Sequence, residues 1–136
     1  IEACLVGSEM CIRDSIRIEG PDQMEAAAKK ILDFGPGSVL LKGGHLKGSQ
    51  LYDVLVTSLG SEWFETERID TRHTHGTGCS LASAIATGLA QGLVLDKAVC
   101  RAREYVLKAI RTAPGFGSGH GPLGHCHTVS IFPPKK

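Results

Sequence analysis

Residues 74–79, with the sequence THGTGC, form a loop of small and polar residues that runs directly into an apolar, alanine-rich segment typical of a helix. Gly76 and Gly78 allow a tight turn that brings backbone N–H groups close to a ligand. The first turn of a helix leaves about four N–H groups without partners and carries a partial positive charge. Loop and helix start therefore predict a site for a phosphate-sized anion. Cys79 places a thiol where a thiolate is favoured, so phosphoryl or acyl transfer is indicated.

A second candidate is Lys42, which follows the apolar run Val39–Leu41 and precedes Gly43 and Gly44. The apolar run is typical of a buried strand, and ligand sites in open α/β sheets lie at the carboxyl ends of strands. A lysine there can neutralise phosphate charge during transfer. A solvated lysine is the simpler interpretation of Lys42 alone. The two glycines favour binding, because they let a ligand approach the backbone.

Neither glycine-rich segment matches a standard nucleotide fingerprint. Residues 76–79 are not a Walker A loop, because no Gly-Lys-Ser/Thr follows, and an ordinary glycine-rich helix start is the alternative to an anion site. Residues 119–124 match the letters of G-x-G-x-x-G, but they follow a helix rather than a strand and contain Pro122. We therefore reject the dinucleotide interpretation. A plain surface loop is favoured there over a lid or a loop beside a nucleotide.

The histidines do not predict a metal site. His73 and His75 have the two-residue spacing that can place ligands on one side of a strand, and so do His125 and His127. A zinc site usually presents two well-spaced ligand pairs, however, and Cys126 has no Cys-x-x-Cys partner. We expect no metal held by these side chains. His73 and His75 are assigned instead to holding the loop by hydrogen bonds or to lining the ligand pocket.

The elements that must position these groups alternate between helical and strand patterns. Helices are predicted from Pro21 to about Leu32, over 81–91 with Gly92 just beyond its end, and over 96–111; strands are predicted over 39–41, 51–57 and 63–69, with a hairpin at 59–60. This order predicts an α/β fold. Two or three strands do not make a stable sheet alone, so we expect the C-terminal part of a larger domain.

The bulk composition sets further limits. The chain has 136 residues, 42% hydrophobic and 21% charged, which is typical of one ordinary soluble domain. Its formal net charge of +1 indicates neither a nucleic-acid-binding surface nor an acidic tail. No apolar run approaches the roughly 18 residues that cross a bilayer. Five irregularly spaced cysteines do not resemble a disulfide framework, so a reducing compartment is expected.

The first fifteen residues differ in character from the rest. The chain does not begin with Met, and Ile1–Ser15 has no basic region or uninterrupted apolar core of a signal peptide. Residues 4–15 resemble translated sequencing-adapter sequence. We therefore predict that residues 1–15 are an artefact without a fold, with a genuine strand and turn as the alternative.

Together, the motifs resemble the hydroxymethylpyrimidine/phosphomethylpyrimidine kinases of thiamine biosynthesis, which belong to the ribokinase-like superfamily. The resemblance covers Ile16 to about His125 and corresponds to the C-terminal half of those enzymes. Its most specific elements are the KGGH sequence at 42–45 and THGTGC at 74–79. Most members have Thr after the cysteine, and Ser80 keeps the hydroxyl. The resemblance implies that residues 16–136 are the C-terminal part of a three-layer α/β/α domain with a mainly parallel sheet.

The resemblance also implies an activity. It is an ATP- and Mg²⁺-dependent phosphorylation of 4-amino-5-hydroxymethyl-2-methylpyrimidine, and then of its monophosphate. Gly76, Thr77 and Gly78 would form the anion hole for the transferring phosphoryl group, and Lys42 would contact the phosphates of ATP. Cys79 would stand where other ribokinase-like enzymes have an Asp base. It acts either as the base, which we favour slightly, or only to position the substrate hydroxyl.

Several alternatives stay open. The family's N-terminal half supplies most of the pyrimidine pocket, so the chain alone is expected to be inactive. The other functions are a pyridoxal kinase of the same superfamily, a module of a fused thiamine-biosynthesis protein, or a non-catalytic anion-binding fragment. The expected partners are a pyrimidine substrate and ATP, without nucleic acid or membrane, in a homo-oligomer when full length. The expected location is cytoplasmic, or plastid if the source is a plant or alga.

Overall fold

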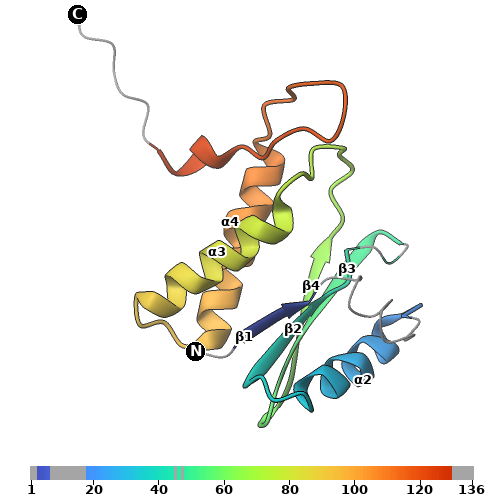
Figure 1. Cartoon of the computed structure of the whole chain (residues 1–136). Helices are drawn as coiled ribbons and strands as arrows, with labels where there is room; N and C mark the ends of the chain where they lie inside the picture. Colours follow the sequence, from blue (N-terminus) through green and yellow to red (C-terminus); the bar gives the residue numbers. More distant parts are fainter. Residues whose placement is uncertain (1–2, 7–17, 45, 47, 130–136) are drawn as a thin grey trace, which may run out of the picture. The chain divides into compact units, whose positions relative to one another are not determined.

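The computed structural model describes residues 3–6, 18–44, 46 and 48–129 (Figure 1). The chain divides into two compact units, Ile1–Arg68 and Ile69–Lys136. No helix among the described residues is both long and apolar enough to span a membrane.

The first unit is a four-stranded sheet with one helix on it. The strands lie in the order β1 (Ala3–Val6), β2 (Ser38–Lys42), β3 (Gln50–Thr57) and β4 (Gly60–Glu67), and α2 (Pro21–Leu32) packs against one face (Figure 1). β1 pairs with β2 in parallel, whereas β2–β3 and β3–β4 are antiparallel. The predicted helix, the strand at 51–57 and the hairpin are confirmed within one or two residues.

Two expectations differ from this sheet. A mainly parallel sheet is not found among the described residues, because short connections join β2, β3 and β4, and parallel strands need a crossover of a dozen or more residues. The expectation of no fold in residues 1–15 also differs from the structure, since Ala3–Val6 is a strand. An unpaired strand edge accepts almost any extended backbone, which accounts for this pairing. The adapter origin of the segment stays a prediction.

Helix α2 forms because its sequence supplies both a start and an apolar stripe. Pro21 occupies the first helical turn, where its missing N–H costs nothing, and Asp22 complements the positive end of the helix. The stripe packs on alternate residues of β2 and β3: Met24, Ala27, Ala28 and Ile31 meet Val39, Leu41, Val54 and Val56. Burial of each larger side chain in this core contributes about 1.5–3 kcal/mol.

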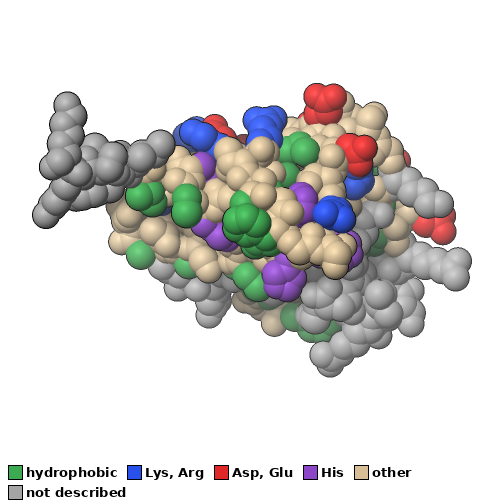
Figure 2. Space-filling view, turned by 90° about the horizontal axis from the view of Figure 1, so that it is seen from above, with side chains coloured by type: hydrophobic (Ala, Val, Ile, Leu, Met, Phe, Trp, Pro, Cys, Tyr) green, Lys and Arg blue, Asp and Glu red, His purple; other side chains and the backbone are tan. Residues whose placement is uncertain are grey.

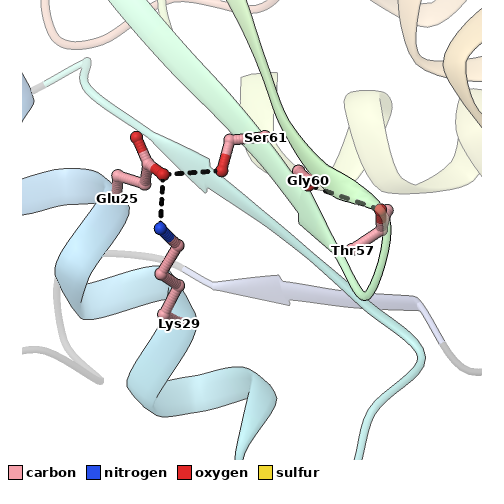
Figure 3. A network of polar contacts seen from close by, with 5 residues as sticks. All are labelled: Glu25, Lys29, Thr57, Gly60 and Ser61. Atoms are coloured by element: carbon pink, nitrogen blue, oxygen red, sulfur yellow. Dashed lines mark hydrogen bonds and ion pairs between the residues drawn. The ribbon is translucent and has the colours of Figure 1, made fainter.

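A polar contact links α2 to the hairpin (Figure 3). Glu25 Oε1 lies 2.6 Å from Lys29 Nζ and accepts a hydrogen bond of 2.8 Å from Ser61 Oγ. Lys29 first, and then Ser61, hold the pKa of Glu25 below its ordinary value of 4.5. The hairpin is closed by a hydrogen bond of 3.3 Å from Thr57 Oγ1 to the carbonyl of Gly60.

The second unit consists of two packed helices and the loops at their ends. α3 spans Thr77–Ala90 and α4 spans Leu95–Arg111; the short 3₁₀ helix η1, His125–Thr128, follows near the end of the described chain. The helices approach closely where a Cβ on Gly88 would lie 3.0 Å from the Cβ of Ala98. The residues buried on the two helices are mostly small or branched: Leu81, Ile85, Gly88, Ala98, Val99, Ala102, Val106 and Ala109.

The ends of α3 show what the sequence does and does not specify. The predicted stop is confirmed: Gly92 has φ +85°, its N–H donates to the carbonyl of Leu89, and the N–H of Leu93 donates to that of Gly88. The predicted start was wrong by four residues, because the helix begins at Thr77 rather than Leu81. The glycine-rich loop therefore contributes its last residues to the first helical turn.

Candidate functional site

Helix α3 begins with backbone N–H groups that donate no hydrogen bond to any described residue. Gly76 caps the helix in the left-handed conformation (φ +84°), which favours glycine. The N–H of Thr77 donates to the carbonyl of Thr74 at 3.3 Å. The next two N–H groups, those of Gly78 and Cys79, donate to no described residue. Four predicted site residues are thus consecutive at one helix start, and two of them offer unused donors.

The charge at this helix start is also left uncompensated. The first turn of α3 contains no acidic residue, and Gly76 makes no side-chain capping hydrogen bond. An acidic or capping side chain would normally satisfy these donors and offset the helix dipole. Two free N–H groups at the positive end of a 14-residue helix can instead bind a phosphate oxygen. Cys79 is an exposed free thiol on the same turn.

The loop before α3 is held by a second glycine-rich loop, residues 115–124. His75 forms an isolated β-bridge with Pro122. A Cβ on Gly121 would lie 2.2 Å from Nδ1 of His73, so the ring packs directly under that glycine. This Nδ1 atom is buried and has no hydrogen-bond partner among the described residues. His75 thus holds the loop through its backbone and His73 through its packing.

Lys42 lies in the other unit, at the carboxyl end of β2, as predicted from the sequence. It is half-buried and pairs in register with Asp53 of β3. A Cβ on Gly43 would lie 2.3 Å from the carbonyl oxygen of Tyr52, so packing alone accounts for this glycine. Gly44 is exposed, and a Cβ there would meet nothing within 4 Å. The role of Lys42 at a phosphate site stays a prediction.

The loop after Lys42 is anchored by one arginine. Arg68 donates from Nε to the carbonyl of Gly48 at 2.8 Å, from one terminal nitrogen to that of Gly44 at 3.1 Å, and from the other to that of Leu46. The N–H of Gly43 donates to Asp53 Oδ1 at 3.2 Å. Residue 45 of the KGGH motif lies outside the described residues. A single guanidinium therefore fixes the backbone that follows the lysine.

The described histidines all belong to the second unit, and several reach the face shown in Figure 2. Tyr105 packs against two of them: its ring lies 6.0 Å from that of His125 and 4.7 Å from that of His127. Tyr105 Oη also lies at hydrogen-bond distance, 2.9 Å, from Nδ1 of His125. Among the described residues, no group of three or more His, Cys, Asp and Glu side chains could hold a metal ion.

Solved structures define the class of protein. The pyridoxal kinase from Bacillus subtilis, determined as an ADP complex, matches with a TM-score of 0.76 and 35% identity over 80% of this chain and 43% of that protein. A phosphomethylpyrimidine kinase from Clostridium difficile matches with a TM-score of 0.63 and 32% identity over 79% and 42%. Both are small-molecule kinases, and the α/β fold is therefore the ribokinase-like one.

The family follows from the sequence comparison. Residues 8–124 match the family model for phosphomethylpyrimidine kinase. The hydroxymethylpyrimidine/phosphomethylpyrimidine kinase of Streptomyces coelicolor is 44% identical over 110 residues, which is 81% of this chain. The chain belongs to the phosphomethylpyrimidine kinase family. It spans 40% of the length of the Streptomyces relative.

Sequence reasoning missed the residues that hold these loops. Arg68 and Arg72 donate hydrogen bonds to backbone carbonyls that lie 20 or more residues away, and no pattern in the neighbouring sequence predicts such contacts. The contact of Asp53 with the N–H of Gly43 was not predicted either. A weak signal existed for the arginines, since each lies within ten residues of the glycine-rich loop at 74–79.

Proposed function

We propose that this chain carries the phosphoryl-transfer part of an enzyme that phosphorylates 4-amino-5-hydroxymethyl-2-methylpyrimidine and its monophosphate, with ATP as donor, in thiamine biosynthesis. One observation carries the proposal: the N–H groups of Gly78 and Cys79, at the positive end of α3, donate to none of the residues that the structure describes. The family to which the chain belongs supplies the reaction. In this proposal the chain is the C-terminal part of a three-layer domain whose complete sheet is mainly parallel.

The donors at the start of α3 match what phosphoryl transfer requires. Charge accumulates on the transferring group, and catalysis comes from preorganised donors and alignment. Gly76 sets the turn, and Gly78 and Cys79 donate to the transferring phosphoryl group. Thr77 is the first residue of the helix, and its own N–H does not face the phosphoryl group, because it already donates to the carbonyl of Thr74.

The remaining roles fall to Lys42, Cys79 and the nucleotide. Lys42 offsets the charge of the ATP phosphates. Cys79 takes the proton of the substrate hydroxyl, or orients that hydroxyl without taking its proton. Mg²⁺ enters with the nucleotide and neutralises phosphate charge; it commonly needs only one or two protein carboxylates besides substrate phosphates. We assign it no ligand among the described residues, which hold no cluster of three possible ligands.

Pyridoxal is the second candidate substrate. The pyridoxal kinase from Bacillus subtilis superposes with a higher TM-score, 0.76, than the phosphomethylpyrimidine kinase from Clostridium difficile, 0.63. Sequence favours the pyrimidine, since the Streptomyces relative shares 44% of its aligned residues. Both alcohols therefore belong in the assay.

The test is a chimera in which this chain's matching residues replace those of the Streptomyces kinase. We expect ATP-dependent phosphorylation of the hydroxymethylpyrimidine in preference to pyridoxal, measured by product formation. Cys79→Ala should lower kcat at least about 100-fold, the low end of what a general base contributes. Cys100→Ala is the control, because Cys100 is a free thiol on α4, within the matched residues and outside the first turn of α3.

The variants separate the two roles of Cys79. Substantial activity in Cys79→Ser indicates positioning, because a hydroxyl can donate and accept a hydrogen bond but is a poor base near neutral pH. ATP affinity, measured by calorimetry, should change little in Cys79→Ala, since the anion donors are backbone groups. A folded chimera that phosphorylates neither alcohol, or pyridoxal alone, contradicts the proposed function.

A further inference from the structure

The segment that leads into α3 is held by side chains that are not among the predicted site residues. Arg72 donates from its two terminal nitrogens to the carbonyls of Gly117, at 3.2 Å, and Ser118, at 3.4 Å. In return, His120 lies with Nδ1 3.1 Å from the carbonyl oxygen of Arg72. Because a carbonyl only accepts, Nδ1 of His120 carries the proton in this contact. The two loops are therefore tied in both directions.

Residues 115–124 can lie close to the segment before α3 only because two positions in that loop are glycines with no room for a Cβ. A Cβ on Gly121 would lie 2.2 Å from His73 Nδ1 and 2.8 Å from the carbonyl oxygen of Phe116. A Cβ on Gly124 would lie 2.1 Å from the carbonyl oxygen of Thr112. Gly119, in contrast, would meet nothing within 4 Å and has no positive φ. The motif at 119–124 is thus explained by packing at two of its three glycines.

We propose that Arg72, His120 and Gly121 are positioning residues for the anion site, and we call this set the loop clamp. The inference rests on the proposed function, because it concerns the donors of Gly78 and Cys79. The loop clamp fixes the backbone from Arg72 to Gly76 and thereby sets where α3 begins. It touches neither nucleotide nor substrate in this proposal.

The physical reason is that two backbone donors bind an anion well only when their directions converge. The path into α3 is irregular from residue 68 to 76, apart from the bridge at His75, and it ends in a left-handed glycine. Without external contacts such a segment samples many conformations, and ordering it at the moment of binding costs affinity. An error of about 1 Å in donor position can lower a rate on the order of 100-fold.

The test uses the ¹⁵N-labelled 136-residue chain, with inorganic phosphate as the probe. Gly121→Ala is compared with Gly119→Ala, a matched glycine substitution in the same loop that meets no neighbour. Arg72→Ala removes two exposed hydrogen bonds and leaves the buried core intact. Two readouts are recorded: phosphate affinity from the shifts of the Gly78 and Cys79 amides, and fast backbone motion of residues 73–77 from relaxation without phosphate.

We expect Gly121→Ala and Arg72→Ala to weaken phosphate binding by about tenfold or more, the size of a lost alignment. Both should increase motion in residues 73–77, whereas Gly119→Ala should change neither quantity. Phosphate binding at wild-type affinity in both variants overturns the loop clamp and leaves the proposed function intact.

Two further outcomes are also decisive. If phosphate does not shift the Gly78 and Cys79 amides of the wild-type chain, the anion site itself is wrong, and the loop clamp, which positions that site, is overturned with it. Backbone motion of residues 73–77 that is unchanged in both Gly121→Ala and Arg72→Ala also overturns the loop clamp. If Gly121→Ala loses the signals of α4 and has not folded, Arg72→Ala decides the same question.

Discussion

The protein holds two glycine-containing loops with arginine side chains, and it does so in different ways. Arg68 anchors the loop after β2 through three carbonyls of one short segment, between Gly44 and Gly48. Arg72 instead reaches carbonyls of Gly117 and Ser118, 45 and 46 residues further along the chain, at longer distances. Arg68 and its acceptors flank a single hairpin, β3–β4, which we call local anchoring, whereas the loop before α3 depends on a partner loop 45 residues further along the chain, which we call distant anchoring.

This difference teaches what each loop can tolerate. A locally anchored loop keeps its shape as long as its own strand pair is intact, because the anchor and its acceptors flank the same hairpin. The conformation of the loop before α3 depends on its contacts with residues 115–124, so we expect substitutions in residues 115–124 to alter the anion site. Local anchoring therefore favours stability, and distant anchoring couples two parts of the second unit.

The largest effect is expected from Gly43→Ala. Its Cβ would lie 2.3 Å from a backbone oxygen of β3, which cannot move without disturbing the sheet. We expect the free energy of unfolding to fall by about 2–4 kcal/mol, as for severe overpacking. Urea unfolding followed by fluorescence of Trp63, the single tryptophan of the chain and part of the first unit, measures this.

Gly44→Ala is the control for that substitution, because a Cβ on Gly44 meets nothing within 4 Å. It should shift the unfolding free energy by less than about 0.5 kcal/mol, as is usual for surface changes. Equal losses in the two variants would show that the backbone near Gly43 relaxes easily, and the first loop would then be less rigid than its contacts indicate.

A smaller effect is expected from Arg68→Ala compared with Arg72→Ala. Arg68→Ala removes three charge-assisted hydrogen bonds and should lower the unfolding free energy by about 1–2 kcal/mol, because the acceptors are partly exposed to water. Arg72→Ala should cost less than about 1 kcal/mol, since its hydrogen bonds are exposed and long. The reverse order of the two losses contradicts the distinction between local and distant anchoring.

The smallest effect concerns Glu25, whose contacts with Lys29 and Ser61 join α2 to the β3–β4 hairpin. Its pKa is lowered in the folded chain, chiefly by Lys29 and then by Ser61, so the ionised form is favoured by folding. The resulting stability is present above the ordinary pKa of 4.5 and is lost as the pH falls through the lower folded value. Glu25→Gln should remove this part of the acid dependence in urea unfolding recorded at pH 3 to 6, roughly the window set by carboxyl titration. An unchanged acid dependence in Glu25→Gln argues that the exposed contact contributes nothing.

Local patterns predicted most of the elements, and long-range contacts explain what they did not predict. The stripe of α2 and the stop at Gly92 are encoded by neighbours in the sequence, so both were predictable. The start of α3 was not predicted. The glycines at 76 and 78 disfavour a helix, so the pattern indicated a start at Leu81, whereas the helix begins at Thr77. The direction of the strands depends on the lengths of the connections between them.

The reasons for individual glycines were the hardest part to predict. The sequence suggested that Gly43 and Gly44 both let a ligand approach the backbone. In the structure, a side chain at position 43 would collide with the carbonyl oxygen of Tyr52, so packing requires a glycine there. Gly121 was assigned to a surface loop, and its lack of a side chain makes room for His73. A glycine is the same residue whether a ligand or a neighbouring chain segment excludes its Cβ, so only the fold distinguishes the two cases.

The parallel pairing of β1 with β2 has a consequence for protein engineering. Residues Ala3–Val6 add to the edge of β2 in the register Ala3 with Ser38 through Val6 with Leu41, by backbone contacts that any extended strand can make. With β1 removed, the same edge becomes an acceptor for a strand supplied in trans by a separately expressed segment of a relative. The edge of β2 is therefore the place in the first unit at which a strand of a second polypeptide can be added through backbone hydrogen bonds.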